Sequence, residues 1–206
     1  RDVERSRGLG DVYKRQTQCG VPTGQPKFPL QTYQELPDPA APSDKEWAAV
    51  TTTQVSWGTT DVRYAKHGLP RLKNQQTVAL KGWRGERVNA QAVVWTGVEL
   101  KDLNFSFGDF KDKKGNVLPQ DAFTGGFVRY VMTDELNKDG RGACGHRKAV
   151  DYDSLLVADP IDTNLKAMAL PARTVQPVWV QCWIPQSAVP GTYKGELLIN
   201  DGSRLL

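Results

Sequence analysis

Short stretches in which apolar and polar residues alternate dominate the chain after residue 50. Side chains point to opposite faces at successive positions of a strand, so this period of two indicates half-buried strands. Clusters of glycine, proline, asparagine and aspartate separate the stretches, and no segment of ten or more residues shows a strong helical stripe. The pattern predicts strands at 53–57, 77–83, 86–96, 102–110, 126–133, 178–184 and 192–200. Many short strands with turn signals between them predict an all-β antiparallel sandwich, either immunoglobulin-like or jelly-roll-like.

Two of these strands show the alternation most clearly. Along 86–96, the even positions from Val88 to Val94 share one face and the odd positions from Asn89 to Trp95 share the other. Along 178–184, Trp179, Gln181 and Trp183 share the face opposite the aliphatic residues. We expect this tryptophan face to be the exposed one, or the one that meets another domain.

Three turn signals lie after predicted strands. Gly115 lies in a charged hairpin loop at 111–116, and the Pro190-Gly191 pair predicts a type II turn in which Gly191 takes a positive φ. Asp201-Gly202 predicts a hairpin turn, followed by only four residues of a partner strand. The sandwich is therefore expected to be incomplete at its last strand, with an aggregation-prone edge at 197–206.

The first 46 residues have a different composition. Residues 1–16 show no periodicity, and their last six, DVYKRQ, resemble a translated sequencing-adapter scar, so they are left out of the fold prediction. Residues 17–46 contain six prolines and are predicted to be a disordered linker arm. Within it, Ser43 is expected to cap a short helix at 44–49, with Glu46 completing a capping box. The sandwich domain is assigned to residues 47–206.

Charge and cysteine usage exclude several classes of protein. Five basic and three acidic residues in 1–16 contribute +2 of the net charge of +4, so the remaining 190 residues lack the basic stripe of a nucleic-acid-binding protein. No apolar run approaches the length of a membrane span. The three cysteines have no paired spacing, and we expect neither a metal site nor a cofactor.

Seven segments of the chain carry a family resemblance. They are SWGTTDVRY (56–64), LKGWRGERVNAQAVVWT (80–96), RYVMTDE (129–135), CGHR (144–147), VADPI (157–161), TVQPVWVQCWI (174–184) and PGTYKGELLI (190–199). In this order they resemble the N-terminal domain of glycoside hydrolase family 123, the β-N-acetylgalactosaminidase-like enzymes common in Bacteroidetes.

The resemblance implies a two-part enzyme. An N-terminal sandwich precedes a (β/α)₈ barrel, where an adjacent Asp-Glu pair assists attack by the substrate's own 2-acetamido oxygen. Such a barrel needs about 200 or more residues, which do not follow here. The resemblance therefore implies an accessory domain that is inactive by itself, packs on the barrel and belongs to a periplasmic, cell-surface or secreted enzyme. GalNAc-containing glycans are the implied ligand class.

Several residues are candidates for contact with substrate or barrel. His146 and Arg147 in the CGHR segment, Arg129, Trp179 and Trp183 form this set, and none of them is expected to be catalytic. Asp134-Glu135 is also an adjacent Asp-Glu pair, but neighbouring strand residues point to opposite faces, so it is not expected to be catalytic. Asp151, Asp153 and Asp159 give only a weak calcium signal.

Two other classes of function remain open. The tryptophans are compatible with a stand-alone carbohydrate-binding module, which would present exposed rings on one face. A structural cell-surface domain would need neither a partner barrel nor a ligand.

Overall fold

The structure, a computed structural model, describes Glu35, residues 42–133 and residues 155–206. All of these residues belong to one compact unit, Glu35–Leu206. Its elements are α2 (Asp44–Trp47), β1 (Thr53–Gly58), β2 (Arg87–Thr96), β3 (Leu100–Phe107), η1 (Gln120–Ala122), β4 (Phe123–Thr133), β5 (Leu155–Asp162), β6 (Ala167–Leu170), β7 (Thr174–Trp183), β8 (Leu197–Asp201) and β9 (Arg204–Leu205).

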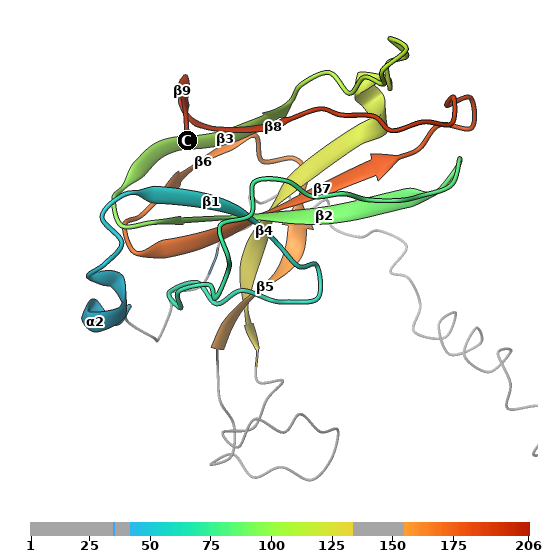
Figure 1. Cartoon of the computed structure of the whole chain (residues 1–206). Helices are drawn as coiled ribbons and strands as arrows, with labels where there is room; N and C mark the ends of the chain where they lie inside the picture. Colours follow the sequence, from blue (N-terminus) through green and yellow to red (C-terminus); the bar gives the residue numbers. More distant parts are fainter. Residues whose placement is uncertain (1–34, 36–41, 134–154) are drawn as a thin grey trace, which may run out of the picture. The chain divides into compact units, whose positions relative to one another are not determined.

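The strands form two antiparallel sheets, which confirms the predicted all-β sandwich (Figure 1). One sheet has the order β1-β2-β7-β4-β5 and the other has the order β6-β3-β8-β9. Buried aliphatic and aromatic side chains from both sheets meet between them and form the largest core cluster. Its members are Ala92, Val94, Phe127 and Val178 from the first sheet and Leu100, Leu103, Leu170 and Ile199 from the second.

The alternation along β2 is confirmed, but the prediction of a half-buried strand is wrong. Val94 faces the core between the sheets, while Val93 and Trp95 on the opposite face join a second buried cluster with Trp47 and Tyr64. All residues from Ala90 to Thr96 are buried. The pattern could not show this, because irregular chain and a single helical turn, rather than a third sheet, cover the outer face.

Helix α2 attaches to that outer face. Ser43 caps it as predicted, with its hydroxyl accepting a hydrogen bond from the Glu46 N–H at 3.4 Å. Trp47 is only 2% exposed, and its indole N–H donates to the His67 carbonyl at 2.8 Å. The helix therefore belongs to the packed domain.

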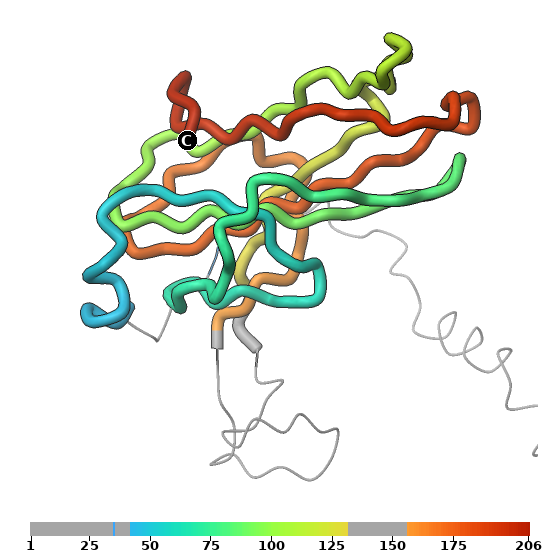
Figure 2. The backbone as a smooth tube through the Cα atoms, in the orientation of Figure 1, coloured from blue at the N-terminus to red at the C-terminus, as the bar shows by residue number. Residues whose placement is uncertain are grey.

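The predicted strand at 77–83 is wrong. This segment runs extended beside the first half of β2 (Figure 2), but it belongs to no sheet. Gly82 packs so closely that a Cβ there would lie 2.6 Å from side-chain atoms of Val88 and Ile184. Glycine weakens strand pairing, and Gly82 instead leaves room for the side chains of Val88 and Ile184. The flanking Val78 and Leu80 remain partly exposed.

Of the three turn predictions, two are confirmed and one is wrong. Gly115 and Gly202 adopt positive φ values of 85° and 61°, as their hairpin loops require. Gly191 does not, so the predicted type II turn is wrong. Instead, Lys194 and Lys111 exchange two backbone hydrogen bonds of 2.9 Å, and this bridge directs the chain toward β8.

Two strands, β5 and β6, were not predicted. β5 contains Asp159-Pro160, residues that are typical of loops. Its position at the edge of the five-stranded sheet permits Pro160, because an edge strand has one side without ladder bonds.

Within the described part of the chain, no helix is long and apolar enough to cross a membrane.

Candidate functional site

Part of the outer face of the five-stranded sheet is not covered by α2 and the irregular chain. This part carries a row of polar and aromatic side chains. The ladder places Asn89 of β2 and Thr124 of β4 on either side of Gln181 of β7. Thr124 donates to the Gln181 side-chain oxygen at 3.4 Å, and Gln181 donates to the Asn89 side-chain oxygen at 3.2 Å. We call this row, together with Arg87 and Trp183 beside it, the outer strip.

Trp183 is the most accessible aromatic residue of the outer strip, with 54% of its surface exposed. Its indole N–H donates to the Gly85 carbonyl at 3.2 Å, and the Arg87 guanidinium carbon lies 4.7 Å from the ring centroid. Both contacts hold the ring in one orientation while leaving a face for a partner. Trp179 on the same face is less exposed and packs against the cluster around Tyr130. The predicted exposed face is thus present, but only Trp183 is broadly accessible.

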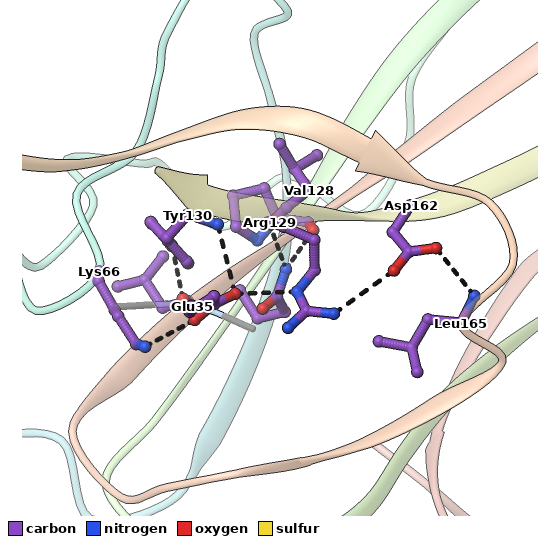
Figure 3. A network of polar contacts seen from close by, with 10 residues as sticks. Glu35, Lys66, Val128, Arg129, Tyr130, Asp162 and Leu165 are labelled. Atoms are coloured by element: carbon purple, nitrogen blue, oxygen red, sulfur yellow. Dashed lines mark hydrogen bonds and ion pairs between the residues drawn. The ribbon is translucent and has the colours of Figure 1, made fainter. Parts of the chain in front are cut away.

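A second polar group lies where β4 and β5 pair, and it centres on Glu35 (Figure 3). Lys66 donates to one Glu35 oxygen at 2.7 Å. Arg129 and the backbone N–H of Tyr130 donate to the other oxygen at 2.9 and 3.3 Å. Arg129 also reaches Asp162 at 3.4 Å. The Glu35 and Arg129 side chains are only 12% and 11% exposed, so these charges compensate each other inside the domain.

The ionisation of Glu35 follows from these contacts. Burial alone would raise the pKa of its carboxyl, but the hydrogen bonds from Lys66 and Arg129 and the charge of Lys66 outweigh it. The net pKa is held below its ordinary value. Glu35 is therefore an ionised anchor and is unsuited to act as a general acid near neutral pH.

The contacts of Arg129 and Asp162 serve the fold. Arg129 is 9% exposed, and it forms ion pairs with Glu35 and Asp162 of the same domain. Asp162 also accepts from the backbone N–H groups of Asn164 and Leu165, both at 3.1 Å, and thereby orders the turn after β5. The sequence offered no signal for Glu35, because it is an isolated carboxylate in a proline-rich stretch.

The other sequence candidates are distributed as follows. His146, Arg147, Asp134-Glu135, Asp151 and Asp153 lie outside the described residues. Asp159 pairs with Arg63 at 3.3 Å. No cluster of metal-binding side chains is found among the described residues.

The inner side of the same sheet borders an apolar groove of about 620 Å³. It lies at the end of the sandwich where Phe107 and Phe123 from the two sheets contact each other in a tilted arrangement, with ring centroids 5.6 Å apart. Cys182 lines the groove, and burial raises the pKa of its thiol, so the thiol stays protonated and weakly nucleophilic.

The family model of the glycoside hydrolase 123 N-terminal domain matches residues 57–201, which include every described strand from β2 to β8. The chain belongs to glycoside hydrolase family 123. No curated protein matches it.

A solved structure supports the fold of this family 123 domain. It is a family 123 glycoside hydrolase from Clostridium perfringens, described in terms of glycolipid glycan hydrolysis. The two chains superpose with a TM-score of 0.59 at 20% sequence identity, and the match covers 73% of this chain. It covers only 24% of the Clostridium chain, so this domain corresponds to about a quarter of that protein's length.

Proposed function

We propose that this chain is the non-catalytic accessory domain of a glycan-degrading, β-N-acetylgalactosaminidase-like family 123 hydrolase. The observation that carries the proposal is the match of residues 57–201 to the N-terminal domain model of the family. In the proposal, a (β/α)₈ barrel in the same parent polypeptide performs substrate-assisted hydrolysis, and the parent enzyme works in the periplasm or at the cell surface.

Two of the described carboxylates, Glu35 and Asp162, agree with a silent domain. Glu35 is ionised and bound to Lys66 and Arg129, and Asp162 is bound to Arg129 and to its own turn. Glycoside hydrolysis with protein carboxylates requires one carboxyl that retains its proton until it reaches the leaving group. The lowered pKa of Glu35 is the opposite of that requirement.

The outer strip supplies a surface for the catalytic domain. Trp183 offers an indole face, and Gln181 and Asn89 offer amide groups that can exchange their mutual hydrogen bond for one to a partner. Large aromatic residues surrounded by polar groups are typical of the centres of protein interfaces.

The second candidate function is a stand-alone carbohydrate-binding module. The observation that favours it is the same Trp183, because an indole ring fixed by Arg87 and Gly85 can stack on a sugar ring. The two functions differ in what the isolated chain does with a glycan.

The test uses the isolated chain with a chromogenic β-GalNAc glycoside and with GalNAc-terminated glycans. We expect no hydrolysis above the buffer rate and no saturable heat at sub-millimolar glycan in titration calorimetry. Saturable binding that Trp183→Ala abolishes, and that Val98→Ala in the exposed β2–β3 loop preserves, would favour the binding module. Hydrolysis by the isolated chain would overturn the accessory role.

A further inference from the structure

The apolar groove at the end of the sandwich is not filled by side chains of the described domain. Its walls come from the inner faces of both sheets and from the segments before β2 and before β8, and they include Val88, Cys182, Phe110 and Leu197. The volume of about 620 Å³ is comparable to that of a ligand pocket. Such an open space at the end of the sandwich leaves apolar side chains without packing partners, so a further segment that covers them would stabilise the domain.

Apolar residues continue from the groove to the surface. Val78, Leu80 and Val189 on its rim are 38%, 46% and 46% exposed, and Trp83 is 85% exposed. An exposed apolar rim around an apolar groove marks an interaction surface. The rim lies beside β8, whose outer edge is nearly unpaired, because β9 pairs only with Asn200 and Asp201.

The backbone of β8 shows which groups point to that free edge. Lys194 and Glu196 bond toward β3, through the backbone of Lys111 and Gly108. The alternation of an antiparallel ladder then turns Gly195, Leu197 and Ile199 to the opposite side. The hydrogen bond from the Leu206 N–H to the Ile199 carbonyl, at 2.9 Å, confirms this direction. Gly195 and Leu197 both line the groove, so the free backbone edge and the groove coincide.

We propose that the groove is covered by a β-strand in which the parent polypeptide runs on from β9 along the free edge of β8. This proposal rests on the proposed function, in which the domain is part of a longer enzyme. The occupant follows from continuity: β9 already runs antiparallel to β8, and Leu206 already packs against the core between the sheets. Strand addition satisfies the edge with main-chain bonds and fills the groove with alternate side chains.

The register is fixed by the existing pairs. Asn200 lies opposite Leu205, so the second, fourth and sixth residues after Leu206 would lie opposite Leu197, Gly195 and Tyr193. Directly opposite residues share a face of the sheet. Leu197 packs on the core between the sheets and Tyr193 packs on the cluster at the groove. The strand is therefore apolar at its second, fourth and sixth residues.

Two C-terminal extensions of equal composition test the proposal on the full 206-residue chain. One carries eight residues with valine at the second, fourth and sixth positions and threonine elsewhere. The control carries valine at the first, third and fifth positions, which turns the apolar face outward. Amide exchange is read at Leu197 and Gly195, with Leu198, which bonds toward β3, as the internal reference.

The in-register extension is expected to slow exchange at Leu197 and Gly195 by about tenfold or more, because a paired amide opens only when the strand leaves. It should also reduce binding of a hydrophobic dye, while the control changes neither readout. Equal behaviour of the two extensions would overturn the proposal. So would light scattering that shows the unextended chain to be a dimer with Leu197 already protected, since a second copy would then fill the edge. Either failure leaves the accessory role intact, because glycoside turnover and calorimetry test that role separately.

Discussion

Replacing Trp47 with alanine is expected to lower the free energy of unfolding by about 3–5 kcal/mol, the usual cost of removing a buried aromatic side chain. Trp47 is 2% exposed, and it is the one buried residue of α2. The substitution leaves a cavity beside Tyr64, Val93 and Trp95 and removes the hydrogen bond to the His67 carbonyl. Urea denaturation followed by circular dichroism measures the loss.

The chain offers a matched control for this substitution. Trp83 is 85% exposed, so Trp83→Ala should change the free energy of unfolding by about 0.5 kcal/mol or less. A loss of similar size in both variants would contradict the packing of α2 on the outer face. A small loss for Trp47→Ala alone would do the same, and it would place the start of the folded domain after the helix.

Removing Arg129 should have an effect of similar size. Arg129→Leu leaves the Glu35 and Asp162 carboxylates without their shared guanidinium, and breaking a buried ion pair costs about 3–5 kcal/mol. Arg87→Leu is the control, because Arg87 is exposed and its guanidinium lies over the Trp183 ring at the surface. The double variant Glu35→Gln/Arg129→Leu should lose less stability than the sum of the losses in the two single variants, since both residues belong to one network. Full additivity would contradict the network.

The same network has a signature in pH. The pKa of Glu35 is lower in the folded chain than its ordinary value of 4.5, so its stabilising contribution is fully present above pH 4.5. It is lost as the pH falls from there through the lower folded pKa. The stability difference between the natural chain and Glu35→Gln should therefore shrink below pH 4.5. Asp109 and Asp112, whose pKa values are also lowered, are common to both chains, so their contributions cancel in this difference.

Sequence patterns predicted the faces of the strands better than the chain segments that cover the outer face of the sheet. The period of two in β2 and β7 assigned Val94 and Trp183 to the correct faces, because that period is a property of each strand alone. The cover of the outer face depends on where irregular chain from Tyr64 to Leu72 returns, and no local pattern encodes that path. β5 was missed because Pro160 is tolerated only at an edge, and strand order is a tertiary property.

The candidate site was likewise predicted only in part. The tryptophan face of β7 was foreseen, whereas Arg87 gained its role only through the register that sets it opposite Trp183. Glu35 lies 94 residues from Arg129 in the chain, so their ion pair depends on long-range folding alone. The single residue of the proline-rich stretch that the structure describes before residue 42 is thus tied to the sandwich.

The most direct measurement of the central claim is the sequence of the parent gene beyond the codon for Leu206. An accessory domain of a family 123 hydrolase predicts two features there in order. The first is a segment that is apolar at its second, fourth and sixth residues, and the second is a (β/α)₈ barrel with an adjacent Asp-Glu pair. A stop codon at that point, or an unrelated domain after it, would contradict the claim.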